Sequence, residues 1–290
     1  MSLPPHLPRI LLASDLSGRC DRAHDRALQF ARDLPGELHV VHALDPTPTV
    51  TARVTQALPS WRRPADPRAA AARRLREDLG DEGREAQVHV VEGLPEEAVL
   101  RVARTLPADL IVTGLARDEP MARLQMGSTA DALLRDLPAP LLSVRRRVRG
   151  PYRRVVVATD FSPISRPALL AALQWCPNAQ VTVFHAYETA RAGLGGEAPP
   201  DAAWRPALEQ QCAAYLDGAG LAASARPQLT QVIERGYAGA LLSDYVDHQG
   251  VDLVVLGTHG HGGLMKALLG STAQALMHIL ECDVMVVRGR

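Results

Sequence analysis

A glycine-rich segment, GTHGHGGLMKALLGST from Gly257 to Thr272, holds the residues of this sequence best suited to binding an anion. It follows a short apolar run and leads into a helical pattern that begins near Ser271. The first N–H groups of a helix lack partners within the helix and carry partial positive charge. Because a glycine lets an anion approach the backbone, we predict that Gly270, Ser271 and Thr272 form a phosphate-binding turn.

Asp160 is the second candidate, because it ends an earlier apolar run, Val155–Ala158. Ligands of open α/β sheets bind at the carboxyl ends of strands, where the strand order switches. Gly257 and Gly260 stand where the chain leaves another strand, so Asp160 is predicted at the same edge, facing a ribose diol or a metal ion. Two simpler interpretations stay open: the glycines are turn residues, and Ser271 is a helix N-cap. The segment matches neither a Walker A loop nor a G-x-G-x-x-G fingerprint.

The elements that must position these residues occur twice, because most of the chain repeats with a period of 143 residues. Repeats of this kind indicate duplicated structural units. The matched segments start at Ile10 and Val155, Leu38 and Val181, Ala108 and Val251, Met126 and Leu269, and Leu141 and Val284. Only the first pair has a different offset, 145 residues.

Each copy alternates short apolar runs with helical patterns, which predicts an α/β fold. In the second copy the predicted strands are Val155–Ala158, Val181–Ala186, Gln231–Ile233, Leu253–Leu256 and Val284–Val287. The predicted helices are Arg166–Trp175, Trp204–Ala219, Tyr237–His248 and Ser271–Leu280. We expect a mainly parallel five-stranded sheet in each copy, with helices on both faces. Stretches 45–67 and 188–206, rich in Pro, Gly and Ala, are predicted to be the least ordered.

A linker, RRRVRGPYRR from Arg145 to Arg154, separates the copies. Its Gly150-Pro151 pair is a chain breaker, and we predict domains at 1–147 and 151–290. Its six arginines would suit a nucleic-acid arm, but we favour a solvated linker with basic flanks. The formal net charge of zero also argues against a nucleic-acid partner.

The spacing Gly257-x2-Gly260-x9-Gly270-Ser271 resembles the G-2x-G-9x-G-[S/T] signature of the universal stress protein family. Asp160 and the closing run CDVMVVR are also similar to that family, and the resemblance covers both halves, as in a tandem member. It implies the strand order 3-2-1-4-5 and binding of ATP, with or without Mg²⁺.

The same resemblance assigns roles to individual residues. It implies that Asp160 meets the ribose, that the backbone of Ala186 contacts adenine, and that Leu256 and Gly257 line the nucleoside. The residues it implies for the phosphates are Gly260, Gly270, Ser271, Thr272 and Ala273.

The first copy departs from the pattern. It keeps the matching residues Asp15, Gly114, Gly127, Ser128 and Thr129. However, Arg117 replaces the second glycine, and Asp131 adds negative charge where the second copy has Gln274. We therefore predict one nucleotide per chain, in the second copy.

Other residues could take part in such a site. Lys266, the only lysine, could pair with a phosphate, but simple exposure is favoured. For His259 and His261 we favour solvent exposure, then hydrogen bonding to the ligand, over metal ligation. His42 and His185 end equivalent strands, which predicts a shared structural hydrogen bond, and Trp61 and Trp204 are expected to pack on their own domains rather than on a base.

The last strands, Leu141–Val144 and Val284–Val287, are short and apolar. A last strand lies at a sheet edge, where its unpaired backbone groups invite another strand. Members that resemble one copy usually dimerise through this strand. We therefore predict an internal pseudo-dimer in which these two strands are antiparallel neighbours, and homo-oligomers through other faces stay open.

The four cysteines, Cys20, Cys176, Cys212 and Cys282, show no metal-binding spacing and indicate a reducing, cytoplasmic environment. No apolar run has the length of a signal or membrane segment. The leading hypothesis is a stress-response protein whose second copy binds ATP as a sensor or switch. The alternative is an interaction module of the same fold without nucleotide. Nothing specific indicates catalysis, so at most slow ATP hydrolysis is expected.

Overall fold

The computed structural model describes residues 6–44, 66–114, 128–188, 201–221, 227, 229–258 and 271–289. The two stretches predicted to be least ordered fall largely outside these ranges. The elements of the first half are β1 (Arg9–Ala13), α1 (Asp21–Asp33), β2 (Glu37–Leu44), α3 (Pro67–Leu79), β3 (Gln87–Glu92), α4 (Pro95–Thr105), β4 (Leu110–Gly114), α5 (Ser128–Arg135) and β5 (Leu141–Val144).

The second half repeats this order of strands and helices. Its elements are β6 (Arg154–Ala158), the 3₁₀ helix η2 (Pro163–Ser165), α6 (Arg166–Trp175), β7 (Gln180–Tyr187), α7 (Asp201–Asp217), β8 (Leu229–Arg235), α8 (Ala238–Gln249), β9 (Leu253–Gly257), α9 (Ser271–Ile279) and β10 (Asp283–Val287). The predicted strands and helices of this half are all present, with ends that differ by a few residues.

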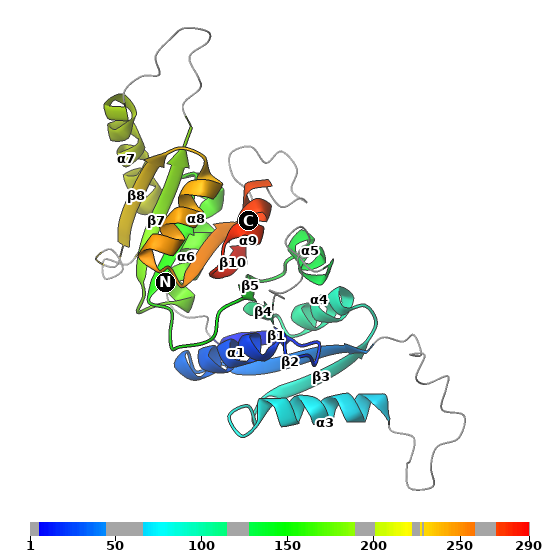
Figure 1. Cartoon of the computed structure of the whole chain (residues 1–290). Helices are drawn as coiled ribbons and strands as arrows, with labels where there is room; N and C mark the ends of the chain where they lie inside the picture. Colours follow the sequence, from blue (N-terminus) through cyan, green and yellow to red (C-terminus); the bar gives the residue numbers. More distant parts are fainter. Residues whose placement is uncertain are drawn as a thin grey trace, which may run out of the picture.

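Within the described residues, the ten strands form one continuous sheet in the order β3-β2-β1-β4-β5-β10-β9-β6-β7-β8 (Figure 1). Each half therefore has the predicted order 3-2-1-4-5, and its own pairings are parallel. The two predicted five-stranded sheets are joined edge to edge, through β5 and β10.

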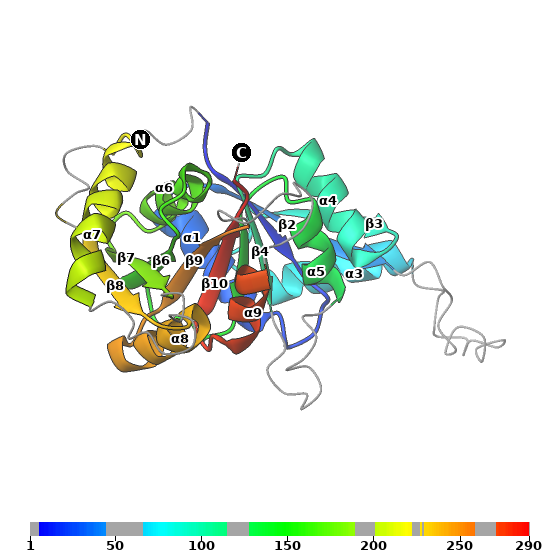
Figure 2. The same ribbon diagram turned by 90° about the horizontal axis from the view of Figure 1, so that it is seen from above.

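The inner strands are buried on both faces over most of their length, which explains their nearly continuous apolar sequences, whereas the edge strands β3 and β8 are much less buried and more polar. Along β1, Ile10 and Leu12 point to one face of the sheet, while Leu11 and Ala13 point to the other. Helices α1, α3, α6 and α7 cover the first face, and α4, α5, α8 and α9 cover the second (Figure 2). The pseudo-two-fold repeat thus places equivalent helices on the same side of the common sheet.

The two halves join through β5 and β10, the two strands predicted to pair. They are antiparallel, with Ser143 opposite Val284 and Leu142 opposite Met285, and all four residues are buried. This pairing confirms the predicted contact. It removes the unpaired edge that either half would otherwise expose.

Aromatic side chains continue the core across the seam. The ring of Phe30 on α1 packs edge-on against Trp175 of α6 and against Tyr152 of the linker, with ring centroids 5.7 and 5.9 Å apart. Edge-to-face pairs of this kind contribute about 1 kcal/mol beyond simple burial. None of the helices in the described part of the chain has both the length and the apolar character that a bilayer crossing requires.

Candidate functional site

The turn that follows β6 holds Asp160 in a constrained backbone. Its Oδ1 accepts hydrogen bonds from the Ser162 amide at 3.0 Å and the Ser162 hydroxyl at 2.5 Å. Between them Phe161 has a φ of 60°, in the left-handed region that bulky residues avoid. Such strain persists only where the surroundings impose it, and it often marks functional sites.

The surroundings of Phe161 supply that constraint. Its ring is buried, with centroids 4.4 Å from His185 and 5.8 Å from Tyr215. Its amide donates to Thr159 Oγ1 at 2.9 Å. His185 Nδ1 lies 2.8 Å from the Thr159 carbonyl oxygen, so the end of β7 is hydrogen-bonded to the same turn.

The first copy builds the same turn. Asp15 Oδ1 accepts from the Ser17 amide at 2.9 Å and from its hydroxyl at 2.6 Å, and Leu16 has a φ of 59°. His42 Nδ1 lies 2.9 Å from the Ser14 carbonyl oxygen. The shared structural hydrogen bond predicted for His42 and His185 is therefore present in both halves.

Three strand ends of the second half meet at one edge. Because Ala158 of β6 pairs with both Phe184 of β7 and Leu256 of β9, the carboxyl ends of these three strands lie beside one another. Asp160, Ala186 and Gly257 are thus gathered at the carboxyl edge of the sheet, each half-buried. Leu256, also predicted for this site, is 3% exposed and belongs mainly to the core.

The predicted phosphate-binding residues lie partly outside the described ranges. Gly260, Gly270, His259, His261 and Lys266 fall there. Helix α9 begins at Ser271, as the sequence predicted, and Thr272 follows in its first turn. Ala273 is buried against the sheet. Trp61 also falls outside the described residues, whereas Trp204 is 46% exposed at the start of α7, so it is less tightly packed than predicted.

In the first copy, the chain covers the end of β4 closely. A Cβ placed on Gly114 would lie 2.7 Å from the Arg19 carbonyl oxygen, so this turn tolerates only glycine without a shift of the backbone. Ser128 and Thr129 open α5, and Asp131 is in its second turn. Arg117 and Gly127, which bear on nucleotide binding in this copy, lie outside the described residues.

Asp15 has a neighbour that its counterpart lacks. The Cys20 thiol donates to Asp15 Oδ1 at 3.1 Å, and the residue at the matching place in the second copy is Ser165. Burial acts to raise the pKa of Asp15, but hydrogen bonds from Ser17 and Cys20, with the charge of Arg19, hold it below its usual value. Burial also raises the pKa of Cys20 to about 12, so this thiol stays protonated.

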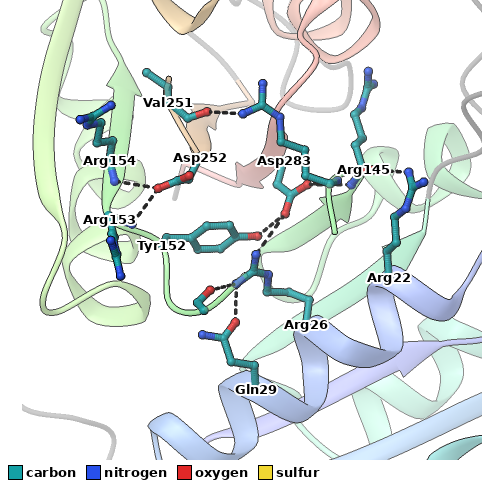
Figure 3. A network of polar contacts seen from close by, with 12 residues as sticks. Arg22, Arg26, Gln29, Arg145, Tyr152, Arg153, Arg154, Val251, Asp252 and Asp283 are labelled. Carbon is teal, nitrogen blue, oxygen red and sulfur yellow. Dashed lines mark hydrogen bonds and ion pairs between the residues drawn. The ribbon is translucent and has the colours of Figure 1, made fainter. Parts of the chain in front are cut away.

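The linker is solvated only in part. Arg147, Arg149 and Arg153 are exposed, as predicted, but Tyr152 is 6% exposed and donates a hydrogen bond to the fully buried Asp283 (Figure 3). Asp283 occupies the place of Pro140 in the repeat, so the comparison of the copies could not reveal it. The sequence did contain one indication of a buried carboxylate, because Asp283 begins the apolar run DVMVV and acidic residues are rarely buried without a partner.

Metal-binding and disulfide chemistry find no support in the described residues. In these ranges, no group of three or more His, Cys, Asp or Glu side chains is arranged to hold a metal ion. Cys20, Cys176, Cys212 and Cys282 are buried free thiols.

Comparisons with known proteins agree with this architecture. The chain is 32% identical over 143 residues to universal stress protein A homolog 1 of Coxiella burnetii. The matched region covers 47% of this chain and 96% of that protein. It is 23% identical to universal stress protein E of Photorhabdus laumondii, over 67% of this chain and 66% of that protein.

Two solved structures resemble the chain over nearly its whole length. A functionally unknown protein of Pseudomonas aeruginosa matches 98% of this chain and 93% of its own, with a TM-score of 0.68 at 19% identity. A universal stress protein of Archaeoglobus fulgidus matches 97% of this chain and 98% of its own, with a TM-score of 0.66 at 16% identity. The model of the universal stress protein family matches residues 6–145 and again residues 151–288, so this chain belongs to that family as a tandem member.

Proposed function

We propose that this stress-response protein binds ATP in its second domain, residues 151–290, and acts as a sensor or switch. The observation that carries the proposal is the convergence of Asp160, Ala186 and Gly257 at the carboxyl edge of the sheet. In open α/β sheets this edge is where ligands bind. The proposed bounds of the first domain are residues 1–147.

The nucleoside would lie against the ends of β6, β7 and β9. Asp160 is held by Ser162 through one carboxylate oxygen, in a turn that Phe161 makes rigid. A carboxylate placed in this way suits the hydroxyl groups of a ribose. Half-buried backbone at Ala186 and Gly257 offers amide and carbonyl groups to a base at the same edge.

The phosphates would lie at the start of α9. A helix that begins at Ser271 directs unpaired N–H groups and partial positive charge toward the preceding turn. We assign Gly260, Gly270, Ser271, Thr272 and Ala273 to this end of the nucleotide. Mg²⁺ would arrive bound to the phosphates, since the described residues supply no cluster of metal ligands.

Binding alone would be enough for a switch. A ligand shifts a conformational equilibrium by its difference in affinity for two states, with no need for turnover. At most, slow hydrolysis of ATP would accompany binding. The four buried free thiols support a reducing, cytoplasmic environment for this activity.

The first domain is proposed not to bind nucleotide. Arg117 and Asp131 stand where the second copy has Gly260 and Gln274. These two substitutions favour the second candidate function, a protein-interaction module of the same fold, for the first half of the chain.

Mass analysis of small molecules released from freshly purified, denatured protein tests the proposal. We expect adenine nucleotide, and calorimetry with ATP should then give one site per chain. A stoichiometry near two would mean that Arg117 and Asp131 are tolerated. No binding by either method would leave the interaction module as the function of both halves.

A further inference from the structure

A cavity of about 620 Å³ lies at the seam between the halves, away from the proposed ATP site. Among the described residues, seven arginines line it: Arg22 and Arg26 from α1, and five from the linker region. Figure 3 shows Arg22, Arg26, Arg145 and Arg153 among them. The lining carboxylates are Asp252 and Asp283. Seven guanidinium groups against two carboxylates leave the lining with a formal charge of +5.

The two carboxylates are occupied mainly by uncharged donors. Asp283 accepts from the amides of Arg145 and Arg146 at 2.7 and 2.8 Å, and from the Tyr152 hydroxyl at 2.6 Å. Asp252 accepts from the amides of Arg153 and Arg154 at 2.8 and 3.0 Å. Because backbone groups use these oxygens, the acids hold the linker in place rather than pairing closely with its guanidinium groups.

Several of the guanidinium groups contact neutral oxygens. Arg22 donates to the Arg145 carbonyl at 2.6 Å, Arg26 to the Gly150 carbonyl at 3.0 Å, and Arg146 to the Val251 carbonyl at 3.1 Å. Carbonyl oxygens orient these side chains without removing their charge. The shortest distance between Arg26 and Asp283 is 3.8 Å.

Other donors at the cavity are unused. Within the described ranges, the side chains of Arg147, Arg149 and Arg153 have no hydrogen-bond or ion-pair partner, and all three are exposed. Arg26 is only 4% exposed, yet its Nε has no partner. The unused donors that an anion in the cavity could reach are those of the three exposed arginines.

We propose that this cavity binds a compact anion carrying two or more phosphate groups. Arginine presents planar pairs of donors that match phosphate oxygens, and the volume is that of a small-molecule site. The cavity is concave and bounded by both halves, and the chain has no net charge. These features favour a small ligand over nucleic acid, which requires an extended basic face.

This site is distinct from the proposed ATP site. Its contributions from the second half come from Asp252 and Asp283, at the amino ends of β9 and β10. Asp160 follows β6 and Gly257 ends β9, so both lie at the opposite, carboxyl edge. An anion in the cavity would contact α1, the linker and the second half together, and so would bridge the two domains.

Calorimetry with inorganic triphosphate tests the proposal on the full chain. The variant R147Q/R149Q/R153Q removes exposed charges from the cavity, and R73Q/R76Q/R84Q removes the same charge from the exposed surface of the first half. We expect the cavity variant to bind triphosphate about 100-fold more weakly and the control to change by about twofold or less. Equal losses in both variants, or no loss in the cavity variant, would overturn the proposal.

Triphosphate could also enter the proposed ATP site, so Gly270→Val is measured in parallel. This variant should keep the arginine-dependent binding. If it removes all triphosphate binding, the cavity proposal fails while the ATP proposal stands. If it leaves ATP binding unchanged, the ATP proposal fails independently.

Two further measurements control for folding and for nucleic acid. The variant R147K/R149K/R153K keeps the charge and should recover part of the affinity, and triphosphate should raise the Tm of the wild-type chain but not that of the glutamine variant. Binding of single-stranded DNA of 20 nucleotides is measured by fluorescence anisotropy, because typical single-stranded binding sites span about 4–16 nucleotides. Arginine-dependent binding of DNA tighter than that of triphosphate would overturn the small-ligand proposal.

Discussion

The Tyr152 hydroxyl donates a 2.6 Å hydrogen bond to Asp283, and both residues are buried where the two halves meet. Tyr152 belongs to the linker, whereas Asp283 begins the last strand, β10. The Arg26 guanidinium, from α1, lies 3.8 Å from the centroid of the Tyr152 ring. One contact network thus joins the first helix, the linker and the final strand of the chain (Figure 3).

We expect Tyr152→Phe to lower the free energy of unfolding by about 2 kcal/mol, because a buried carboxylate loses a donor. Urea unfolding at pH 7 measures the change. Tyr237→Phe serves as the control, since Tyr237 is 63% exposed and its loss of a hydroxyl should cost less than about 0.5 kcal/mol. Equal stability of the wild type and the Tyr152 variant would show that the bond contributes nothing net.

Gly270→Val should abolish ATP binding, because its side chain would project into the proposed phosphate site before α9. Gly127→Val is the matched change in the first copy and should leave ATP affinity within about twofold of the wild type. Calorimetry compares the two variants. If both bind ATP normally, the phosphates are held elsewhere; if Gly127→Val alone loses binding, the nucleotide belongs to the first copy.

A chain of residues 151–290 should form a homodimer. Without the first half, β10 would expose its edge and the apolar residues that now pair with β5. Two copies can restore this contact by pairing their β10 strands antiparallel. The linker no longer raises the local concentration of the partner strand, so dimerisation depends on the protein concentration. Light scattering after size-exclusion chromatography gives the mass, and a monodisperse monomer at micromolar concentration would contradict the prediction.

Stability should fall as the pH is lowered from 7 to 5. The ring nitrogens of His39 and His89 lie 3.1 Å apart across β2 and β3. Burial lowers the pKa of His39, opposed by Glu37, and burial with the neighbouring His39 lowers that of His89. As the pH falls through the usual value of 6.5, the histidines are therefore protonated in the unfolded chain before they are protonated in the folded chain. Their contribution to stability is complete above that pH and is lost below it.

Urea unfolding at several pH values checks this dependence through two variants. His89→Gln should make the loss of stability toward pH 5 smaller. His248→Gln should act in the opposite direction, because a hydrogen bond to Asp244 raises the pKa of His248 and its charged form is favoured on folding. A pH dependence that is identical in the wild type and His89→Gln would mean that the histidine pair does not control it.

The repeat alone predicts most of the architecture. The hydrophobic periodicities of strands and helices occur in both copies and predict the strand Val155–Ala158 and the helix Arg166–Trp175 correctly, because local hydrophobic patterns reflect which faces are buried. The apolar last strands also predict the pairing of β5 with β10, because an unprotected edge must be covered. Asp160 is likewise placed at the carboxyl edge by its position after a strand.

The seam could be described only from the tertiary structure. Arg26 occupies the place of Ala171 in the repeat and Asp283 that of Pro140, so neither has a counterpart that would mark it. Whether a linker arginine faces solvent, a carbonyl or a cavity depends on how α1, the linker and β10 pack in three dimensions. The structures of segments that follow local patterns are determined by the sequence around them, whereas the seam cavity brings the arginine-rich linker together with α1 and β10, whose residues lie more than 100 positions away.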